Sequence, residues 1–248
     1  MILFVGCSFT WGAGWQYEYL IEQENYSFEQ IQKMMPPDYF LEHCSHKADK
    51  YRQEKHFPNI VAKYFDSAYC LAKNGNGGNN DEIKNLLYDS SMRVLGGQGQ
   101  CKLVVVQFTD WQRSHHSEHK ITDSKQIEKI AKHQIDSIRN AIGDTKWVGI
   151  SWFEDMGKVM KKHYPQNYVP IFESGEELTG FEKLSTEGPS NRPHPYTIFG
   201  WAKDKGGYIS DTHFNSYGHQ FIAKQIIKKI KENDLVWYLY TESNGANR

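Results

Sequence analysis

The chain has 248 residues, enough for one large α/β domain built around a single core. Lys and Arg number 29 against 30 Asp and Glu, so the net charge of -1 argues against nucleic acid or an anionic membrane as a partner. The four cysteines show no paired spacing, no signal-peptide pattern precedes the first apolar run, and no stretch approaches the roughly 20 apolar residues that span a bilayer. These features predict a cytoplasmic protein, although a virion component would have the same composition.

The first predicted element is a buried strand over residues 1–5. It is followed by the glycine-bounded segment 6–12, Gly-Cys-Ser-Phe-Thr-Trp-Gly, which is typical of a loop that leaves a strand. Ser8 therefore lies at the carboxyl end of a strand, where open α/β sheets bind their ligands. Taken alone, Ser8 is also compatible with the capping of the next helix.

Strand and helix patterns alternate along the rest of the chain. Predicted helices cover 55–65, 79–95, 124–141, 154–163 and 215–232, and predicted strands cover 68–72, 103–108 and 146–152. The apolar, β-branched run at 103–108 is typical of a central parallel strand that is buried on both faces. This alternation predicts a three-layer α/β/α sandwich with a mostly parallel, doubly wound, flavodoxin-like sheet of about five strands.

Two segments interrupt the alternation. Residues 15–50 contain only a short helix-like pattern at 19–34, and residues 153–210 are rich in Gly and Pro beyond 163, with a short strand expected at 171–172. We expect a single domain over 1–248 with insertions at about 15–50 and 153–210. The apolar tail at 235–240 is expected to add an edge strand or to contact a partner, including a second copy of the chain.

A second polar cluster lies near the end of the chain. Asp211 and His213 directly precede the helix predicted at 215–232. A serine hydroxyl is a poor nucleophile unless a base removes its proton and a third group holds that base in the correct tautomer. Ser8, His213 and Asp211 are residues of the three types needed for these roles.

Four sequence blocks in this order resemble those of the SGNH (GDSL-like) hydrolases. They are Gly-Cys-Ser-Phe-Thr at 6–10, Asn-Gly-Gly-Asn-Asn-Asp at 76–81, Gln-Phe-Thr-Asp at 107–110, and Asp-Thr-His-Phe-Asn-Ser-Tyr-Gly-His at 211–219. The resemblance implies a catalytic triad of Ser8, His213 and Asp211. It also implies an oxyanion hole formed by the backbone N–H groups of Ser8 and Gly77 with a side chain of the third block.

The third block departs from the family pattern at this last donor. Thr109 stands where the family usually has an asparagine, and losing one oxyanion donor typically costs about 3 kcal/mol in the transition state. Asn79 and Asn80 of the neighbouring block are the candidates to compensate. Cys7 replaces the family's usual aspartate before the serine, a change that we expect to leave the loop geometry intact.

Other polar residues have competing interpretations. We assign Trp11 and Arg113 to substrate binding, since a guanidinium can hold a carboxylate or phosphate, although a structural ion pair would equally explain Arg113. The His115, Glu118 and His119 group does not have the order of a zinc-protease motif, and we interpret it, like the His43, Cys44 and His46 group, as a surface segment. We therefore expect no metal and no cofactor. His219 is assigned to packing, and Asp110 to bracing of its own loop.

The functional expectation is a serine ester hydrolase that acts through an acyl-enzyme on a short-acyl ester. The resemblance suggests an acetylated carbohydrate or another small-molecule ester as substrate. The alternative is a non-catalytic SGNH-like module for glycan binding, or a structural part of a larger assembly such as a phage particle. Thr109, the insertions and the aromatic tail favour that alternative.

Overall fold

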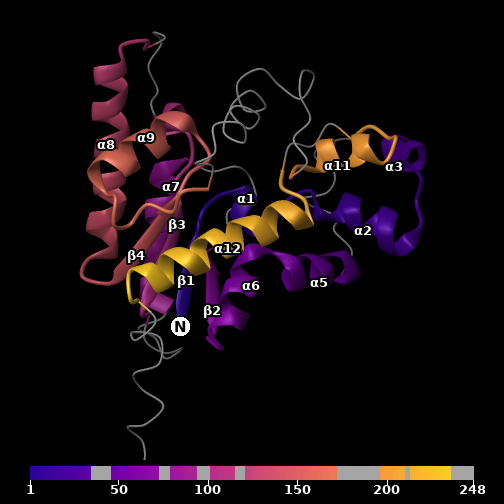
Figure 1. The fold of residues 1–248 in the computed structure, drawn as a ribbon, viewed down its shortest axis with the longest axis horizontal. Coiled ribbons are helices and arrows are strands. Elements are labelled where there is room, and N and C mark those ends of the chain that lie inside the picture. The colour runs from indigo at the N-terminus through magenta and orange to yellow at the C-terminus, as the bar shows by residue number, and fades with distance from the viewer. Residues whose placement is uncertain are drawn as a thin grey trace, which may run out of the picture.

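The centre of the molecule is a parallel sheet with the strand order β2-β1-β3-β4 (Figure 1). The computed structural model describes residues 1–34, 46–72, 79–93, 101–114, 121–171, 196–209 and 213–235. Within these residues the strands are β1 (Ile2–Val5), β2 (Tyr69–Ala72), β3 (Leu103–Gln107) and β4 (Lys146–Ile150). Val5 pairs with Val106, so β1 and β3 end beside each other.

Helices follow each strand and complete the α/β alternation. They are α1 (Ser8–Trp11), α2 (Trp15–Glu24), α3 (Phe28–Met34), α5 (His46–Lys55), α6 (Phe57–Tyr64), α7 (Asn80–Arg93), the 3-10 turn η2 (Trp111–Ser114), α8 (Ser124–Ile142), α9 (Glu154–His163), α11 (Ile198–Asp204) and α12 (Ser216–Glu232). The ends of α8 and α12 agree with ordinary capping chemistry, since Asp123 and Asn215 accept hydrogen bonds from the first turns of these helices.

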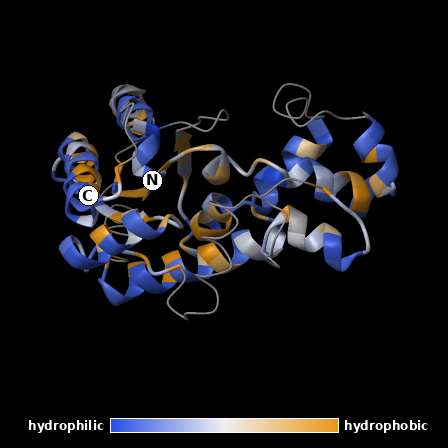
Figure 2. Cartoon of the chain, turned by 90° about the horizontal axis from the view of Figure 1, so that it is seen from above, coloured by the Kyte–Doolittle hydropathy of each residue, from blue (hydrophilic) through white to orange (hydrophobic). Residues whose placement is uncertain are grey.

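Alternate strand residues face two separate hydrophobic layers. Ile2 and Phe4 of β1 pack with α6 and α12, whereas Leu3 and Val5 pack with α7, α8 and α9. Because both faces are covered, the strands are apolar throughout, which is the pattern of a central parallel sheet. In Figure 2 the strands and the helix sides next to them are orange and many outward helix sides are blue. The chain therefore folds as a three-layer α/β/α sandwich, as predicted.

A third cluster lies outside these layers and joins the two predicted insertions. Tyr17 of α2 and Ile31 of α3 pack against Ile198 and Trp201 of α11. A Cβ atom at Gly207 would lie 2.1 Å from the ring of Phe28, so the two segments meet too closely for any larger residue. We call α2, α3 and α11 the helical platform; it lies on the side of the molecule opposite α8 and α9 (Figure 1).

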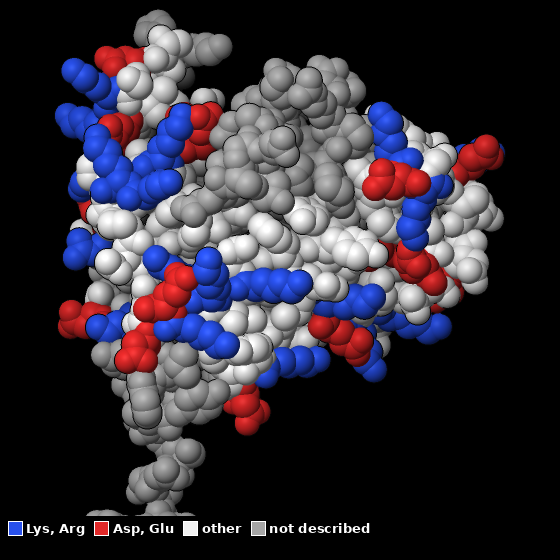
Figure 3. Space-filling view, in the orientation of Figure 1, with Lys and Arg blue, Asp and Glu red and all other residues white. Residues whose placement is uncertain are grey.

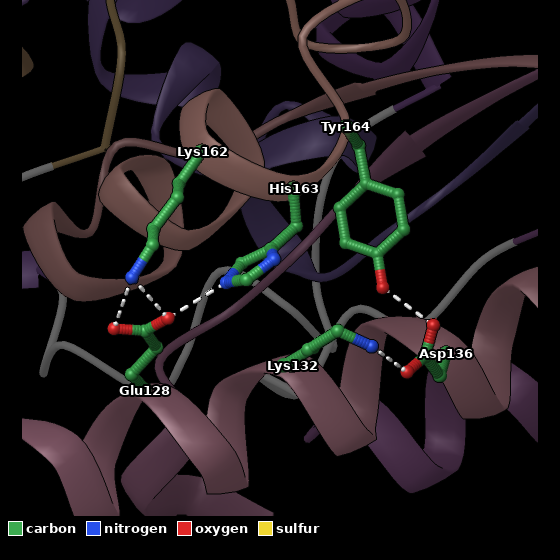
Figure 4. A network of polar contacts seen from close by, with 6 residues as sticks. All are labelled: Glu128, Lys132, Asp136, Lys162, His163 and Tyr164. Carbon is green, nitrogen blue, oxygen red and sulfur yellow. Dashed lines mark hydrogen bonds and ion pairs between the residues drawn. The ribbon is translucent and has the colours of Figure 1, made fainter.

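Helices α8 and α9 are held together by a polar network as well as by their apolar faces (Figure 4). Lys162 and His163 of α9 both contact the Glu128 carboxylate of α8, at 2.7 Å each. Asp136 accepts hydrogen bonds from Lys132 at 2.6 Å and from the Tyr164 hydroxyl at 2.5 Å. Burial acts to raise the pKa of Asp136, but its two hydrogen bonds and the charges of Lys132 and Arg139 together outweigh burial and hold the pKa below its ordinary value.

Most predicted elements are confirmed to within a few residues. The sheet has four strands in the described residues where about five were expected, and the helix-like pattern at 19–34 is divided between α2 and α3, with Asn25 at a positive φ of 58° after α2. Ile171 lies in a bend rather than a strand, while Phe172 and the tail at 236–248 lie outside the described residues. None of the helices in the described ranges is long and apolar enough to cross a membrane.

Candidate active site

Ser8 is the first residue of α1, immediately beyond β1 at the carboxyl edge of the sheet. The chain passes from β1 to β2 through α6 on one face, and from β2 to β3 through α7 on the other. The direction of winding therefore reverses between β1 and β3, and open α/β sheets bind their ligands at such a switch point. Ser8 follows β1 and Thr109 follows β3, so both lie at this switch point.

A buried glutamine of β3 holds the serine loop in place. Gln107 Oε1 accepts hydrogen bonds from the Cys7 backbone N–H at 2.9 Å, from the Cys7 thiol at 2.9 Å and from the Thr10 hydroxyl at 3.2 Å. Cys7 is the N-cap of α1 but makes no side-chain cap, and Ser8 is not a cap, which removes the alternative reading of this serine. Gln107 lies in the third sequence block, but its anchoring role was not predicted, since it occupies an ordinary position at the end of an apolar strand.

Cys7 does not compete with Ser8 as a nucleophile. Its side chain is buried, and burial raises the pKa of the thiol above its ordinary value. A thiol must ionise to attack, so the raised pKa keeps Cys7 in its unreactive form at neutral pH. Of these two side chains, the serine hydroxyl is therefore the candidate nucleophile.

Only glycine fits at the position where β1 turns into the serine loop. A Cβ atom on Gly6 would lie 2.2 Å from Thr10 Oγ1 and 2.8 Å from both Cβ and Oε1 of Gln107. These are the atoms that anchor the loop, so added volume here must displace either the anchor or Ser8.

We therefore expect Gly6→Ala to lower the free energy of unfolding by about 1 to 3 kcal/mol, as overpacking of a tight core usually does. The matched control is Gly157→Ala in α9, where the nearest atom to an added Cβ is the Tyr168 hydroxyl at 3.5 Å, an ordinary contact. That change should be neutral or slightly stabilising, because alanine favours helix over glycine. Urea denaturation of both variants measures the difference, and equal stabilities would contradict the steric argument.

His213 lies beside Ser8, with 2.9 Å between His213 Nε2 and Ser8 Oγ. Its backbone carbonyl accepts a hydrogen bond from the N–H of Ile198 at 2.9 Å, and the next residue, Phe214, forms an antiparallel bridge with Thr197. The imidazole also packs on the ring of Phe9, with 4.5 Å between ring centroids. The backbone of His213 is thus held by the start of α11, and its ring is held by Phe9 of α1.

Asp211 and Gly77 lie outside the described residues, so the acid of the predicted triad and one predicted oxyanion donor stay predictions. The same holds for His43, Cys44, His115, Glu118 and His119. Among the residues that the structure does describe, no cluster of three or more His, Cys, Asp or Glu side chains could hold a metal ion.

Asn80 and Thr109 are joined by two hydrogen bonds at the carboxyl end of β3. The Thr109 N–H donates to Asn80 Oδ1 at 3.1 Å, while Asn80 Nδ2 donates to Thr109 O at 3.3 Å and to Gln134 Oε1 at 2.6 Å. Both hydrogens of the Asn80 amide are therefore committed to the fold, which leaves none for an oxyanion. The Thr109 hydroxyl is different: it is fully buried and has no hydrogen-bond partner among the described residues.

The remaining predicted residues have mainly structural contacts. Trp11 is buried, and the Arg52 guanidinium lies 4.3 Å from the centroid of its ring, which places Trp11 within the packing rather than on an open surface. Arg113 is exposed and lies beside the ring of Phe153 at 5.9 Å. Asp110 accepts a hydrogen bond from the Gln112 N–H, and this bracing role was predicted.

His219 packs in the core, as predicted. Its side chain is fully buried, its Nδ1 accepts a hydrogen bond from the Phe57 N–H at 3.1 Å, and its ring is stacked on that of Phe57. An Nδ1 that accepts a hydrogen bond carries no proton, so the imidazole is neutral in this position.

Comparisons with known proteins do not identify a relative. No family model matches the sequence, and no match was found among curated proteins or among solved structures. The assignment of function therefore depends on the geometry of the site and on the sequence blocks.

Proposed function

We propose that the protein is a serine ester hydrolase of the SGNH type, with Ser8 as nucleophile and His213 as general base. The observation that carries the proposal is the 2.9 Å distance between Ser8 Oγ and His213 Nε2. This is the hydrogen-bonding distance that a base needs in order to take the serine proton, and it joins residues 205 positions apart in the chain. The two sequence blocks that carry these residues add independent support.

The reaction follows from these two groups. His213 Nε2 takes the hydroxyl proton as Ser8 Oγ attacks the ester carbonyl carbon, and the carbonyl electron pair moves onto oxygen. Collapse of this intermediate expels the alcohol, which leaves with the proton from His213, and Ser8 retains the acyl group. Water then attacks the acyl-enzyme with His213 again as base, and the acid and the free serine are released.

The oxyanion of the intermediate needs hydrogen-bond donors. The Ser8 N–H belongs to the first turn of α1, where helices leave N–H groups without intrahelical acceptors. The buried Thr109 hydroxyl is the second donor that we propose, since a buried hydroxyl without a partner is costly unless a ligand satisfies it. The Gly77 N–H is the third proposed donor, and it rests on the resemblance. The Asn80 amide is not a donor in this proposal, because both of its hydrogens are used in hydrogen bonds to Thr109 and Gln134.

The proposed substrate is a short-acyl ester of a small molecule or a carbohydrate. On the face seen in Figure 3, positive side chains over α8, α9 and α12 are interspersed with negative ones, in keeping with the net charge of -1. A surface of mixed sign does not call for a highly charged substrate. We also propose that the protein is cytoplasmic or a component of a virion, and that it associates with itself.

A fluorophosphonate probe tests the proposed nucleophile without knowledge of the substrate. We expect stoichiometric labelling of the native protein, with the adduct on Ser8 by peptide mass spectrometry, and none in Ser8→Ala. Ser67→Ala is the control, because Ser67 is half-buried at the surface and its hydroxyl donates to the neighbouring carbonyl of Ala68. Labelling of Ser8→Ala at the rate of the native protein would contradict the assignment.

The non-catalytic module is the second candidate, and the commitment of the Asn80 amide favours it, because it removes one compensating donor. Native protein that neither reacts with the probe nor hydrolyses p-nitrophenyl acetate, but binds an immobilised glycan, would support that candidate instead.

A further inference from the structure

Glu18 is a buried carboxylate that the proposed mechanism does not use. It belongs to α2, in the first insertion, and only 4% of its surface is exposed. Its Oε2 accepts a hydrogen bond from the backbone N–H of Ser216 at 3.0 Å. Burial raises the pKa of the Glu18 carboxyl, and the hydrogen bonds from Ser216 act in the opposite direction. A buried carboxylate is costly to maintain, so its retention calls for a role.

The N–H that Glu18 binds belongs to the first residue of α12. The first N–H groups of a helix have no intrahelical acceptor, and the positive end of the helix dipole favours a negative charge there. Asn215 satisfies a second of these groups, the Gly218 N–H, at 2.9 Å. One acceptor is therefore local, whereas the other is supplied by a residue 198 positions away.

The start of α12 controls where His213 lies. Ser216 follows His213 by only three residues, and the Asn215 N–H between them donates to Tyr196 O at 3.0 Å. On the other side, the Ile198 N–H of α11 holds the carbonyl of His213. Since α2 and α11 pack together in the helical platform, the short histidine segment is anchored at both ends by one body.

We propose that Glu18 is a positioning residue for His213, and that it anchors the start of α12 to the helical platform so that the imidazole lies within reach of Ser8. This inference rests on the proposed function for its catalytic consequence, whereas the anchoring itself can be measured without turnover. The first insertion is thereby a part of the active-site framework.

The test compares three variants by NMR and by kinetics. Glu18→Ala removes the acceptor, Glu18→Gln keeps an acceptor oxygen without the charge, and Glu22→Gln is the matched control. Glu22 lies on the same helix and also contacts the second insertion, through an exposed ion pair with Lys205, but it does not contact α12. Exposed pairs of this kind contribute little to stability.

We expect faster hydrogen exchange of the Ser216 amide and altered NMR chemical shifts of the His213 imidazole in Glu18→Ala. For ester hydrolysis we expect a 10- to 100-fold lower kcat with KM changed less than threefold, because a displacement of about 1 Å in a catalytic group costs this much. Glu18→Gln should recover most of the kcat and of the amide protection, and Glu22→Gln should match the native protein in each measurement.

The results separate the two proposals. If native protein shows neither hydrolysis nor probe labelling, the proposed function fails, while the Ser216 exchange and the His213 imidazole chemical shifts still decide the role of Glu18. If Glu18→Ala is folded and leaves the exchange, the chemical shifts and kcat at native values, the positioning role is wrong. If Glu18→Ala does not fold, Glu18→Gln decides: near-native Ser216 protection and kcat support the anchor, whereas protection and kcat far below those of Glu22→Gln, despite the retained acceptor oxygen, overturn it.

Discussion

Substitution of Ser8 by alanine should reduce kcat for p-nitrophenyl acetate by at least about 10⁴-fold, since removal of the nucleophile of a serine hydrolase abolishes the covalent route. The fold should survive this change. Ser8 Oγ contacts His213, while the loop itself is anchored through the Cys7 N–H and the Thr10 hydroxyl, both bound to Gln107. Alanine is also well tolerated within the first turn of a helix.

Stopped-flow or plate assays on freshly folded protein, with circular dichroism on the same samples, measure this effect. Ser67→Ala, purified in parallel, controls for a contaminating esterase and should keep the native rate. Hydrolysis by Ser8→Ala at the native rate would show that the activity does not come from Ser8.

Acidification between pH 7.5 and 5 should destabilise the protein through two buried histidines. Burial, assisted by the charge of Arg52, lowers the pKa of His56 to about 3. Burial also lowers the pKa of His219 well below its ordinary value, and the neighbouring histidines and Arg52 act in the same direction. The His219 ring needs the neutral form, because its Nδ1 accepts a hydrogen bond from the Phe57 N–H. The His56 ring is buried with its Nε2 3.0 Å from the Tyr69 hydroxyl, and burial disfavours its charged form.

The sign of the effect follows from proton binding. Below pH 6.5 the unfolded chain binds protons at these histidines and the folded protein does not, so stability is complete above pH 6.5 and falls as the pH is lowered towards the folded pKa. At pH 5 the free energy of unfolding is lower by about 2 kcal/mol through His56. The folded and unfolded states differ in proton binding at His56 over about one and a half pH units, and each pH unit contributes about 1.36 kcal/mol. His219 adds to this loss in the same direction.

Urea denaturation at a series of pH values measures how steeply the free energy of unfolding changes with pH. His56→Gln and His219→Gln should each be less stable at pH 7.5 but should lose less stability on acidification than the native protein. His133→Gln is the control, since His133 is exposed on α8 and its loss should leave the slope unchanged. If the free energy of unfolding of His56→Gln and of His219→Gln changes with pH as steeply as that of the native protein, the acid sensitivity comes from other groups.

The sequence predicted those parts of the molecule that depend on local pattern. The apolar runs at 1–5 and 103–108 are covered on both faces, so their composition alone indicates central strands, and β1 and β3 lie there. Ser8 and His213 were also brought together correctly, because the carboxyl edge of the sheet and the start of the last predicted helix are recognisable from turn and capping residues.

The parts that sequence did not predict depend on contacts between distant segments. Gln107 and Glu18 are polar residues inside a strand and a helix, and nothing near them in the sequence marks them as buried anchors of the serine loop and of α12. The two insertions were predicted as separate excursions, whereas they pack together into one platform. Asn80 was predicted as a donor to the oxyanion, but its partners Thr109 and Gln134 become neighbours only in the folded chain.

The position of α12 has a consequence for synthesis. Its apolar residues Ile222, Ile226 and Ile230 cover the same face of the sheet as α6, yet they are translated long after β1 and β3. Until residues 216–232 have left the ribosome, this face of the sheet is covered by α6 without α12, and the apolar residues that α12 would contact are exposed to solvent. His213, the proposed general base, emerges just before this helix, so the nascent polypeptide completes its core and acquires its proposed chemistry at nearly the same moment.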